Sequence, residues 1–188
     1  EVRRPFSQMG TCMQFSEYDN VVEPFLASVE ARPEEVAMVF QGEKITYRQM
    51  NERVNRFAHL LASGAGVKAG DKVAYLLPNC PEIPEIYYAV QKLGAVAVPL
   101  NFKMIGREVG YLVNASGACT LLFDARFAEA VAEAADEFDH PVELFSVGGA
   151  APLGREAEPL LAEAVAEEPE LFHDPSALSR IQFTGGST

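Results

Sequence analysis

Residues 73–100 read VAYLLPNCPEIPEIYYAVQKLGAVAVPL, and this stretch decides the fold class. It begins and ends with short apolar runs of β-forming residues. Between the runs, prolines stand near the start of a helical pattern and a glycine follows its last apolar residue, as at the two ends of many helices. A strand that is apolar throughout is typical of a parallel sheet covered on both faces. The stretch therefore predicts one β-α-β unit.

The same pattern continues towards the carboxyl terminus. Further apolar runs begin at Cys119 and Val142, so that successive runs start about 23 residues apart, and helical patterns fill residues 106–117 and 125–138. Because crossovers between parallel strands are almost always right-handed, we expect an α/β fold with a doubly wound, mostly parallel sheet and flanking helices. Pro99 cannot donate a ladder hydrogen bond, so its strand is predicted to lie at an edge or to end there.

The sequence before this region predicts two helices and a hairpin. An amphipathic pattern that ends at Pro33 indicates the first helix. Two short apolar stretches flank QGEK, residues 41–44, which is a hairpin signal because glycine lies in the connection. Thr46 followed by Gln49 forms a capping-box pattern at the start of a second helix, predicted from residue 47 to about residue 63.

We divide the chain into an N-terminal arm, residues 1–18, and a partial α/β domain, residues 19–188. Within the domain, residues 148–175 are first rich in glycine, proline and alanine and then acidic, with a short helix expected over 160–170. We expect this segment to be a surface excursion, and excursions of such length are usually functional or mobile. It returns to a predicted strand at residues 179–183.

Composition excludes several classes of function. The 188 residues carry a formal net charge of −12, which opposes binding to nucleic acid or to an anionic membrane surface. No apolar run approaches the roughly 20 residues that a membrane span needs. The three cysteines lie far apart without a CxxC pair, so neither a disulfide framework nor a zinc site is indicated. We therefore expect a cytoplasmic protein.

The last eight residues, IQFTGGST at positions 181–188, predict a phosphate-binding loop after a strand. Glycines let successive backbone N–H groups approach one anion, and the hydroxyls of Thr184, Ser187 and Thr188 add donors. The loop matches neither GxxxxGK[ST] nor GxGxxG. Taken alone, the pattern is more typical of a flexible linker. Its place after a strand favours binding, because ligands of open α/β sheets lie beyond the carboxyl ends of strands.

Residues 45–102, ITYRQMNERVNRFAHLLASGAGVKAGDKVAYLLPNCPEIPEIYYAVQKLGAVAVPLNF, resemble the N-terminal region of acyl-CoA synthetases, members of the AMP-binding, adenylate-forming superfamily. The resemblance extends to the carboxyl end. There, after the aromatic Phe183, the chain is similar to the start of the family's phosphate loop, [YF]-T-[SG]-G-[ST]-T-G-x-P-K-G. Its first five loop positions are filled by Thr184, Gly185, Gly186, Ser187 and Thr188. Glycine at position 185 is similar to the fatty-acid-activating branch.

The resemblance implies a reaction and its cofactors. Such enzymes join a carboxylic acid to the α-phosphate of ATP with Mg²⁺, release pyrophosphate, and pass the acyl group to the thiol of coenzyme A. It implies a long- or medium-chain fatty acid–CoA ligase, with the five loop residues holding nucleotide phosphates and Thr184 contacting Mg²⁺. Residues 19–188 would be a partial N-terminal AMP-binding domain whose phosphate loop starts at 184–188. No catalytic residue is expected within this chain, which we expect to be an inactive N-terminal fragment.

Two alternatives stay open at this stage. The chain could act alone as a non-catalytic binding or assembly module, with the glycine-rich end as a linker. An adenylating enzyme could also transfer its acyl group to a carrier-protein thiol or to oxygen in place of coenzyme A. The arm before Tyr18 could reach a second copy of the chain, so a homo-oligomer is a further possible partner arrangement.

Overall fold

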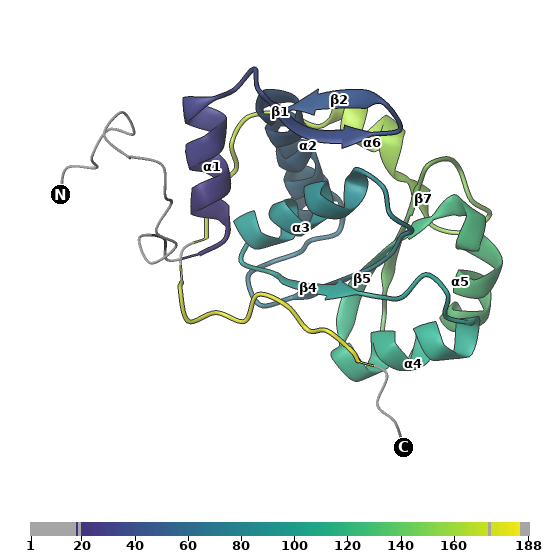
Figure 1. Cartoon of the computed structure of the whole chain (residues 1–188). Helices are drawn as coiled ribbons and strands as arrows, with labels where there is room; N and C mark the ends of the chain where they lie inside the picture. The colour runs from purple at the N-terminus through teal and green to yellow at the C-terminus, as the bar shows by residue number, and fades with distance from the viewer. Residues whose placement is uncertain (1–17, 19, 173, 185–188) are drawn as a thin grey trace.

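A parallel sheet forms the centre of the molecule (Figure 1). The computed structural model describes residue 18 and residues 20–172 and 174–184 of the chain. The sheet has five strands in the order β4-β3-β5-β6-β7, and every neighbouring pair is parallel. The strands are β3 Lys72–Leu76, β4 Val96–Pro99, β5 Ala118–Asp124, β6 Glu143–Val147 and β7 Arg155–Glu156. The predicted α/β fold is confirmed, and so is the edge position of the strand that contains Pro99.

Helices cover both faces of this sheet, as expected for a doubly wound fold. Helix α3, Glu82–Lys92, lies on the same face as α2, Tyr47–His59, while α4, Gly106–Ser116, and α5, Ala128–Ala135, lie on the other (Figure 1). Successive side chains of a strand point to opposite faces. Accordingly Val73 and Tyr75 belong to an apolar cluster with α2 and α3, whereas Ala74 and Leu76 belong to a second cluster with α4 and α5.

The N-terminal elements follow the predicted local signals. They are α1, Val22–Ala31, the antiparallel strands β1, Val36–Phe40, and β2, Glu43–Thr46, and then α2. Thr46 and Gln49 form the predicted capping box, in which each side chain accepts a hydrogen bond from the other residue's backbone N–H. The α-helix ends at His59, and the predicted last turn is instead a π-helix, Leu60–Gly64.

Residues 148–172 contain more secondary structure than was expected for the surface excursion. They contain β7, which extends the sheet, and α6, Ala157–Glu163, which begins and ends earlier than the helix predicted over 160–170. Ala157 and Leu161 are buried against the cluster that contains α2, so this helix is part of the core. Its carboxyl end is capped by Arg56, whose guanidinium donates hydrogen bonds to the carbonyls of residues 161, 162 and 164.

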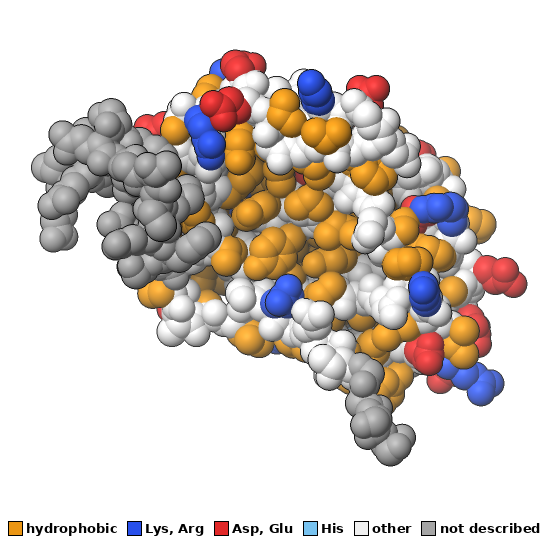
Figure 2. All heavy atoms as spheres, viewed as in Figure 1, with side chains coloured by type: hydrophobic (Ala, Val, Ile, Leu, Met, Phe, Trp, Pro, Cys, Tyr) orange, Lys and Arg blue, Asp and Glu red, His pale blue; other side chains and the backbone are white. Residues whose placement is uncertain are grey.

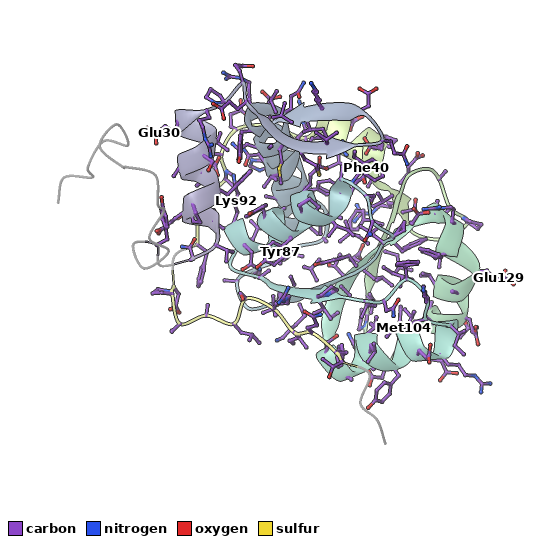
Figure 3. All side chains as sticks on the ribbon, in the orientation of Figure 1. Glu30, Phe40, Tyr87, Lys92, Met104 and Glu129 are labelled. Carbon is purple, nitrogen blue, oxygen red and sulfur yellow. The ribbon has the colours of Figure 1, made fainter. Side chains whose placement is uncertain are left out.

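Apolar side chains reach the surface over α3. Figure 2 shows hydrophobic side chains gathered on the face where Figure 1 places this helix, and Tyr87, labelled in Figure 3, is one of the partly buried residues there. Ile83, one turn earlier, is also only partly buried. No helix within the described ranges has the length and apolar character that crossing a bilayer requires.

Candidate functional site

The candidate loop is reached through a short segment that runs beside β4. The N–H of Ala97 donates to the carbonyl of Ser179 at 3.0 Å, and the N–H of Ile181 donates to the carbonyl of Ala97 at 2.9 Å. These bonds form a single parallel bridge between Ala97 and Arg180, so the strand predicted over 179–183 is reduced to this bridge. Because the pairing is parallel, the segment leaves the sheet at the carboxyl ends of the strands, where Figure 1 shows it passing β4 towards α4.

Thr184 is exposed at this carboxyl edge. Exposure alternates along the segment: Ile181 and Phe183 are partly buried against the cluster beneath α4, whereas Gln182 and Thr184 are exposed. The Thr184 side chain is therefore on the solvent side, where a hydroxyl can donate to a phosphate or supply one oxygen to a metal ion. The other predicted loop residues, Gly185, Gly186, Ser187 and Thr188, lie outside the described residues.

The described part of the chain holds no ready metal centre. Within it, no group of three or more histidine, cysteine, aspartate or glutamate side chains is arranged to hold a metal ion. Mg²⁺ prefers six oxygen ligands in near-octahedral geometry, of which the Thr184 hydroxyl could supply one. The assignment of Thr184 to Mg²⁺ therefore stays a prediction.

A charged pair lies at the point where the strand order reverses. From β3 the chain moves to β4 at one edge of the sheet, and from β5 it moves to β6 towards the other, so the switch point lies between β3 and β5. Asp124, the last residue of β5, accepts hydrogen bonds from Arg126 Nε at 2.9 Å and from an Arg126 terminal nitrogen at 2.8 Å. The hydrogen bond from Arg126 lowers the pKa of Asp124 despite partial burial. The pair thus places an exposed guanidinium at the edge where ligands of such sheets bind.

Aromatic side chains line the same edge. Phe102, in the loop after β4, and Phe127, after β5, stack with their ring centroids 6.3 Å apart. Phe127 and Met104, which is labelled in Figure 3, pack against the same cluster as Phe183. The start of the candidate loop is therefore bordered by an apolar wall as well as by the Asp124–Arg126 pair.

A second polar cluster lies on the face formed by the hairpin and α2. The guanidinium of Arg53 forms a two-pronged ion pair with Glu158 at 2.8 and 3.0 Å and also donates to Glu85 Oε2 at 3.2 Å. Glu85 is only 3% exposed. Burial raises the pKa of this carboxyl to about 7, and Arg53 offsets the effect only in part.

A cavity of about 460 Å³ adjoins this cluster and is lined by side chains of β2, α2 and α3, Lys44, Glu52 and Glu85 among them. No loop after β4, β5 or β6 contributes to its lining. The cavity is therefore separate from the carboxyl edge that the candidate loop reaches. The sequence did not point to this cluster, because its three charged residues are far apart along the chain.

The fold and the position of the loop define a class: an α/β protein whose candidate ligand site lies at the carboxyl edge of a doubly wound sheet. The comparison with protein families then names the particular group. The family model described as "AMP-binding enzyme" matches residues 25–188, and the chain belongs to this family. The match extends through all five predicted loop residues.

Curated relatives of the chain are CoA ligases. It is 32% identical over 120 residues to the long-chain-fatty-acid–CoA ligase of Escherichia coli O6:H1, a match that covers 64% of this chain and 21% of that protein. It is 31% identical over 180 residues to the 3-hydroxybenzoate–CoA ligase of Aromatoleum sp. (strain CIB), covering 95% of this chain and 33% of that protein. The chain thus spans about a fifth to a third of the length of these relatives.

Solved structures share the fold. A Mycobacterium tuberculosis fatty acyl CoA synthetase matches with a TM-score of 0.76 and 28% identity, over 89% of this chain and 33% of that chain. The N-terminal domain of FACL13 from the same organism matches with a TM-score of 0.77 and 29% identity, over 89% of this chain and 42% of that chain. Both likenesses support the placement of this sheet among N-terminal domains of adenylate-forming enzymes.

Proposed function

We propose that this chain is the N-terminal part of an ATP-dependent acid–CoA ligase and carries the start of its phosphate-binding loop. The observation that supports this most directly is the position of Thr184, which is exposed at the carboxyl edge of a sheet in a family of AMP-binding enzymes. Both relatives are named as CoA ligases, which supports coenzyme A as the acceptor of the acyl group.

In the proposed reaction, a carboxylate oxygen attacks the α-phosphorus of ATP and pyrophosphate leaves. The thiol of coenzyme A then attacks the acyl carbon and AMP leaves. The hydroxyl of Thr184 and the backbone amides of Gly185 and Gly186 would hold the departing phosphates in line, with Ser187 and Thr188 as further donors, which is a task of positioning and electrostatic stabilisation. Bound Mg²⁺ would neutralise part of the phosphate charge.

We further propose a long- or medium-chain fatty acid as the substrate. Fatty-acid ligases among the relatives support this choice, as does glycine at position 185. The hydroxybenzoate ligases make aryl acids the competing class.

We also propose a cytoplasmic location. Cys80 and Cys119 are free thiols, as is usual for proteins of a reducing compartment. Association of the protein into a homo-oligomer stays a prediction.

The test uses the full-length protein that contains this chain. Pyrophosphate release and CoA-ester formation are measured with hexadecanoate, octanoate and 3-hydroxybenzoate, each with and without coenzyme A. We expect release with a fatty acid and ester formation only with coenzyme A. Pyrophosphate release without CoA-ester formation, combined with transfer of the acyl group to a carrier protein or to oxygen, would identify a different acceptor.

The reading frame after Thr188 provides a second test. A glycine followed within a few residues by Pro-Lys-Gly or a close variant is expected, because residues 184–188 include no lysine or arginine that could neutralise phosphate. A continuation without a nearby basic residue, together with no pyrophosphate release from any acid, would favour a non-catalytic module.

A further inference from the structure

The segment that delivers Thr184 is joined to the sheet by very little backbone pairing. Only one bridge, between Ala97 and Arg180, connects it to β4 within the described residues. A one-residue slip in such a pairing would turn Phe183 out of the apolar cluster and Thr184 inwards. A slip of two residues would preserve the faces but move Thr184 roughly 7 Å along the edge of the sheet. Something beyond this bridge must therefore fix the register.

Two contacts earlier in the chain, at Glu168 and Phe172, join this segment to α3, and they act before residue 173. The fully buried ammonium of Lys92 forms an ion pair with Glu168 and donates to Asn51 Oδ1 at 2.8 Å and Asn55 Oδ1 at 2.7 Å. The carbonyl of Lys92 accepts from the N–H of Phe172 at 2.9 Å. Figure 3 shows Lys92 beside α1 at the end of α3. Residues 174–178 then follow as an exposed turn, in which the N–H of Ala177 donates to the carbonyl of Asp174 at 3.1 Å and the N–H of Ser176 donates to Asp174 Oδ1 at 2.9 Å.

Gln91 makes a side-chain contact that ties the segment after this turn to α3. Its Nε2 donates to the carbonyl of Ser179 at 2.8 Å, and the same carbonyl accepts from the N–H of Ala97. Among the described side-chain hydrogen bonds between this segment and the helices, this one lies closest in sequence to Thr184. The backbone of α3 at Gln91 is fixed by its neighbours, because Val90 and Lys92 are both buried.

The geometry of an extended chain makes this contact selective. Carbonyls of an extended segment alternate in direction, so a one-residue slip would leave the Gln91 amide facing no carbonyl. A two-residue slip would present a different carbonyl but would have to deform the hydrogen-bonded turn at residues 174–177, which follows the anchored Phe172. The amide thus recognises one position of the segment.

We propose that Gln91 is a positioning residue that fixes the register of residues 179–181 on β4 and thereby sets where the loop beginning at Thr184 presents its donors to phosphate. This inference rests on the proposed function for its consequence in catalysis. The register itself is a property of the fold and is measured separately.

The experiment compares variants of the full-length protein. Gln91→Met retains the side-chain length but removes the donor, and Gln91→Arg restores a donor. Glu129→Met places the same methionine at an exposed position of α5, on the outer side of that helix and away from the terminal segment (Figure 3). Amide hydrogen exchange is followed by mass spectrometry on the peptide covering residues 179–184, alongside the melting temperature and the adenylation kinetics with ATP and with the carboxylic acid.

We expect Gln91→Met to speed exchange in that peptide by about threefold to tenfold, the effect of losing one neutral hydrogen bond. The kcat/KM for MgATP should fall by a similar factor, while the KM for the carboxylic acid and the melting temperature stay unchanged. Gln91→Arg should recover most of both effects, and Glu129→Met should show neither.

Several results would overturn the inference. Unchanged exchange in Gln91→Met would remove the register argument, and faster exchange with normal kinetics for ATP would remove the positioning role. A lowered melting temperature with faster exchange throughout the sheet would make Gln91 a general structural residue. If the wild-type protein forms no adenylate, the proposed function fails, and the exchange comparison alone then decides whether Gln91 sets the register.

Discussion

At the scale of single residues, the candidate loop begins with one exposed hydroxyl whose contribution can be isolated. Thr184→Val in the full-length protein retains the volume of the side chain but removes a donor to a charged phosphate or a ligand to Mg²⁺. Such a partner contributes about 1.5–3 kcal/mol, so the adenylation rate should drop roughly 10- to 150-fold. The rate is measured by pyrophosphate release.

Stability provides the control for this substitution. The Thr184 side chain is exposed, so the free energy of unfolding in urea should change little. Thr188→Val should behave in the same way. Wild-type adenylation rates in both variants would contradict the assignment of the loop.

Glu85 should make the stability of the fold depend on pH. Burial raises the pKa of its carboxyl from 4.5 to about 7 in the folded chain. As pH rises from 4.5, the unfolded state loses this proton first, so the group's contribution to folding is complete below pH 4.5 and is lost by about pH 7. Glu85→Gln should therefore unfold with a free energy higher than wild type by roughly 1–3 kcal/mol at pH 8, and the difference should vanish near pH 4.5.

Urea unfolding at both pH values measures this difference, with Glu129→Gln as a control at an exposed position. Arg53 retains its ion pair with Glu158 in Glu85→Gln, so the substitution leaves no guanidinium unpaired. A Glu85→Gln variant that is less stable than wild type at pH 8 would show that the Arg53–Glu85 pair outweighs the cost of burial.

The sequence predicted the loop that begins at Thr184 but not the Arg53 cluster or the contact of Gln91, for a physical reason. The loop is a contiguous pattern, whereas the partners in the other clusters are joined only by the fold. Arg53 is 32 residues from Glu85 and 105 from Glu158, and Gln91 is 88 from Ser179. Asp124 could have been noted as a charged residue directly after a buried strand, at the edge where ligands bind.

At the scale of elements, the hairpin between β1 and β2 contains a local strain that can be relieved. Its connection is Gln41 and Gly42, with φ values of 50° and 90°. Positive φ at both positions indicates a type I′ turn, for which asparagine followed by glycine is favoured. Gln41→Asn should therefore raise the free energy of unfolding by about 0.5–1 kcal/mol.

Gly42→Ala is the matched opposite change in the same turn. An added Cβ would meet no atom within 4 Å, so any loss of stability would come from the backbone conformation alone. We expect a decrease in the urea midpoint for Gly42→Ala and an increase for Gln41→Asn. If both variants shift the urea midpoint in the same direction, the φ values of the turn do not determine the stability of the hairpin.

The elements that the sequence predicted carry their own local signals. The capping box at Thr46 and the apolar runs of β3 to β6 depend on residues that are adjacent in the chain. Strand β7 was missed because two residues, Arg155 and Glu156, show no apolar alternation and pair only because β6 is beside them. The end of α6 was misplaced because the cap that Arg56 provides comes from α2.

At the scale of the whole molecule, this chain alone is expected neither to bind ATP usefully nor to activate an acid. A few hydroxyl and amide donors contribute about 1.5–3 kcal/mol each to a charged phosphate, against an association cost of roughly 4–15 kcal/mol. The net charge of −12 also opposes an anionic nucleotide. Calorimetric titration of the 188-residue chain with MgATP, beside a pyrophosphate assay with fatty acids, measures both expectations.

Because apolar side chains reach the surface over α3, that titration needs a control for self-association. A chain with exposed apolar side chains tends to self-associate, so the titration is accompanied by sedimentation analysis at the same concentration. Micromolar affinity for ATP, or turnover, in the 188-residue chain would mean that the nucleotide site lies within these residues and does not require a longer protein.

The distance along the chain between Asn55 and its partner sets the order in which the molecule can assemble during synthesis. The Asn55 amide donates to the carbonyl of Ala166, 111 residues later. At about 5–20 residues per second, the ribosome needs roughly 5 to 20 seconds to make that stretch. In this interval Lys92 appears without Glu168, so its ammonium stays hydrated. Burial of that charge, and with it the docking of the segment that leads to Thr184, can therefore occur only after the central strands have been made.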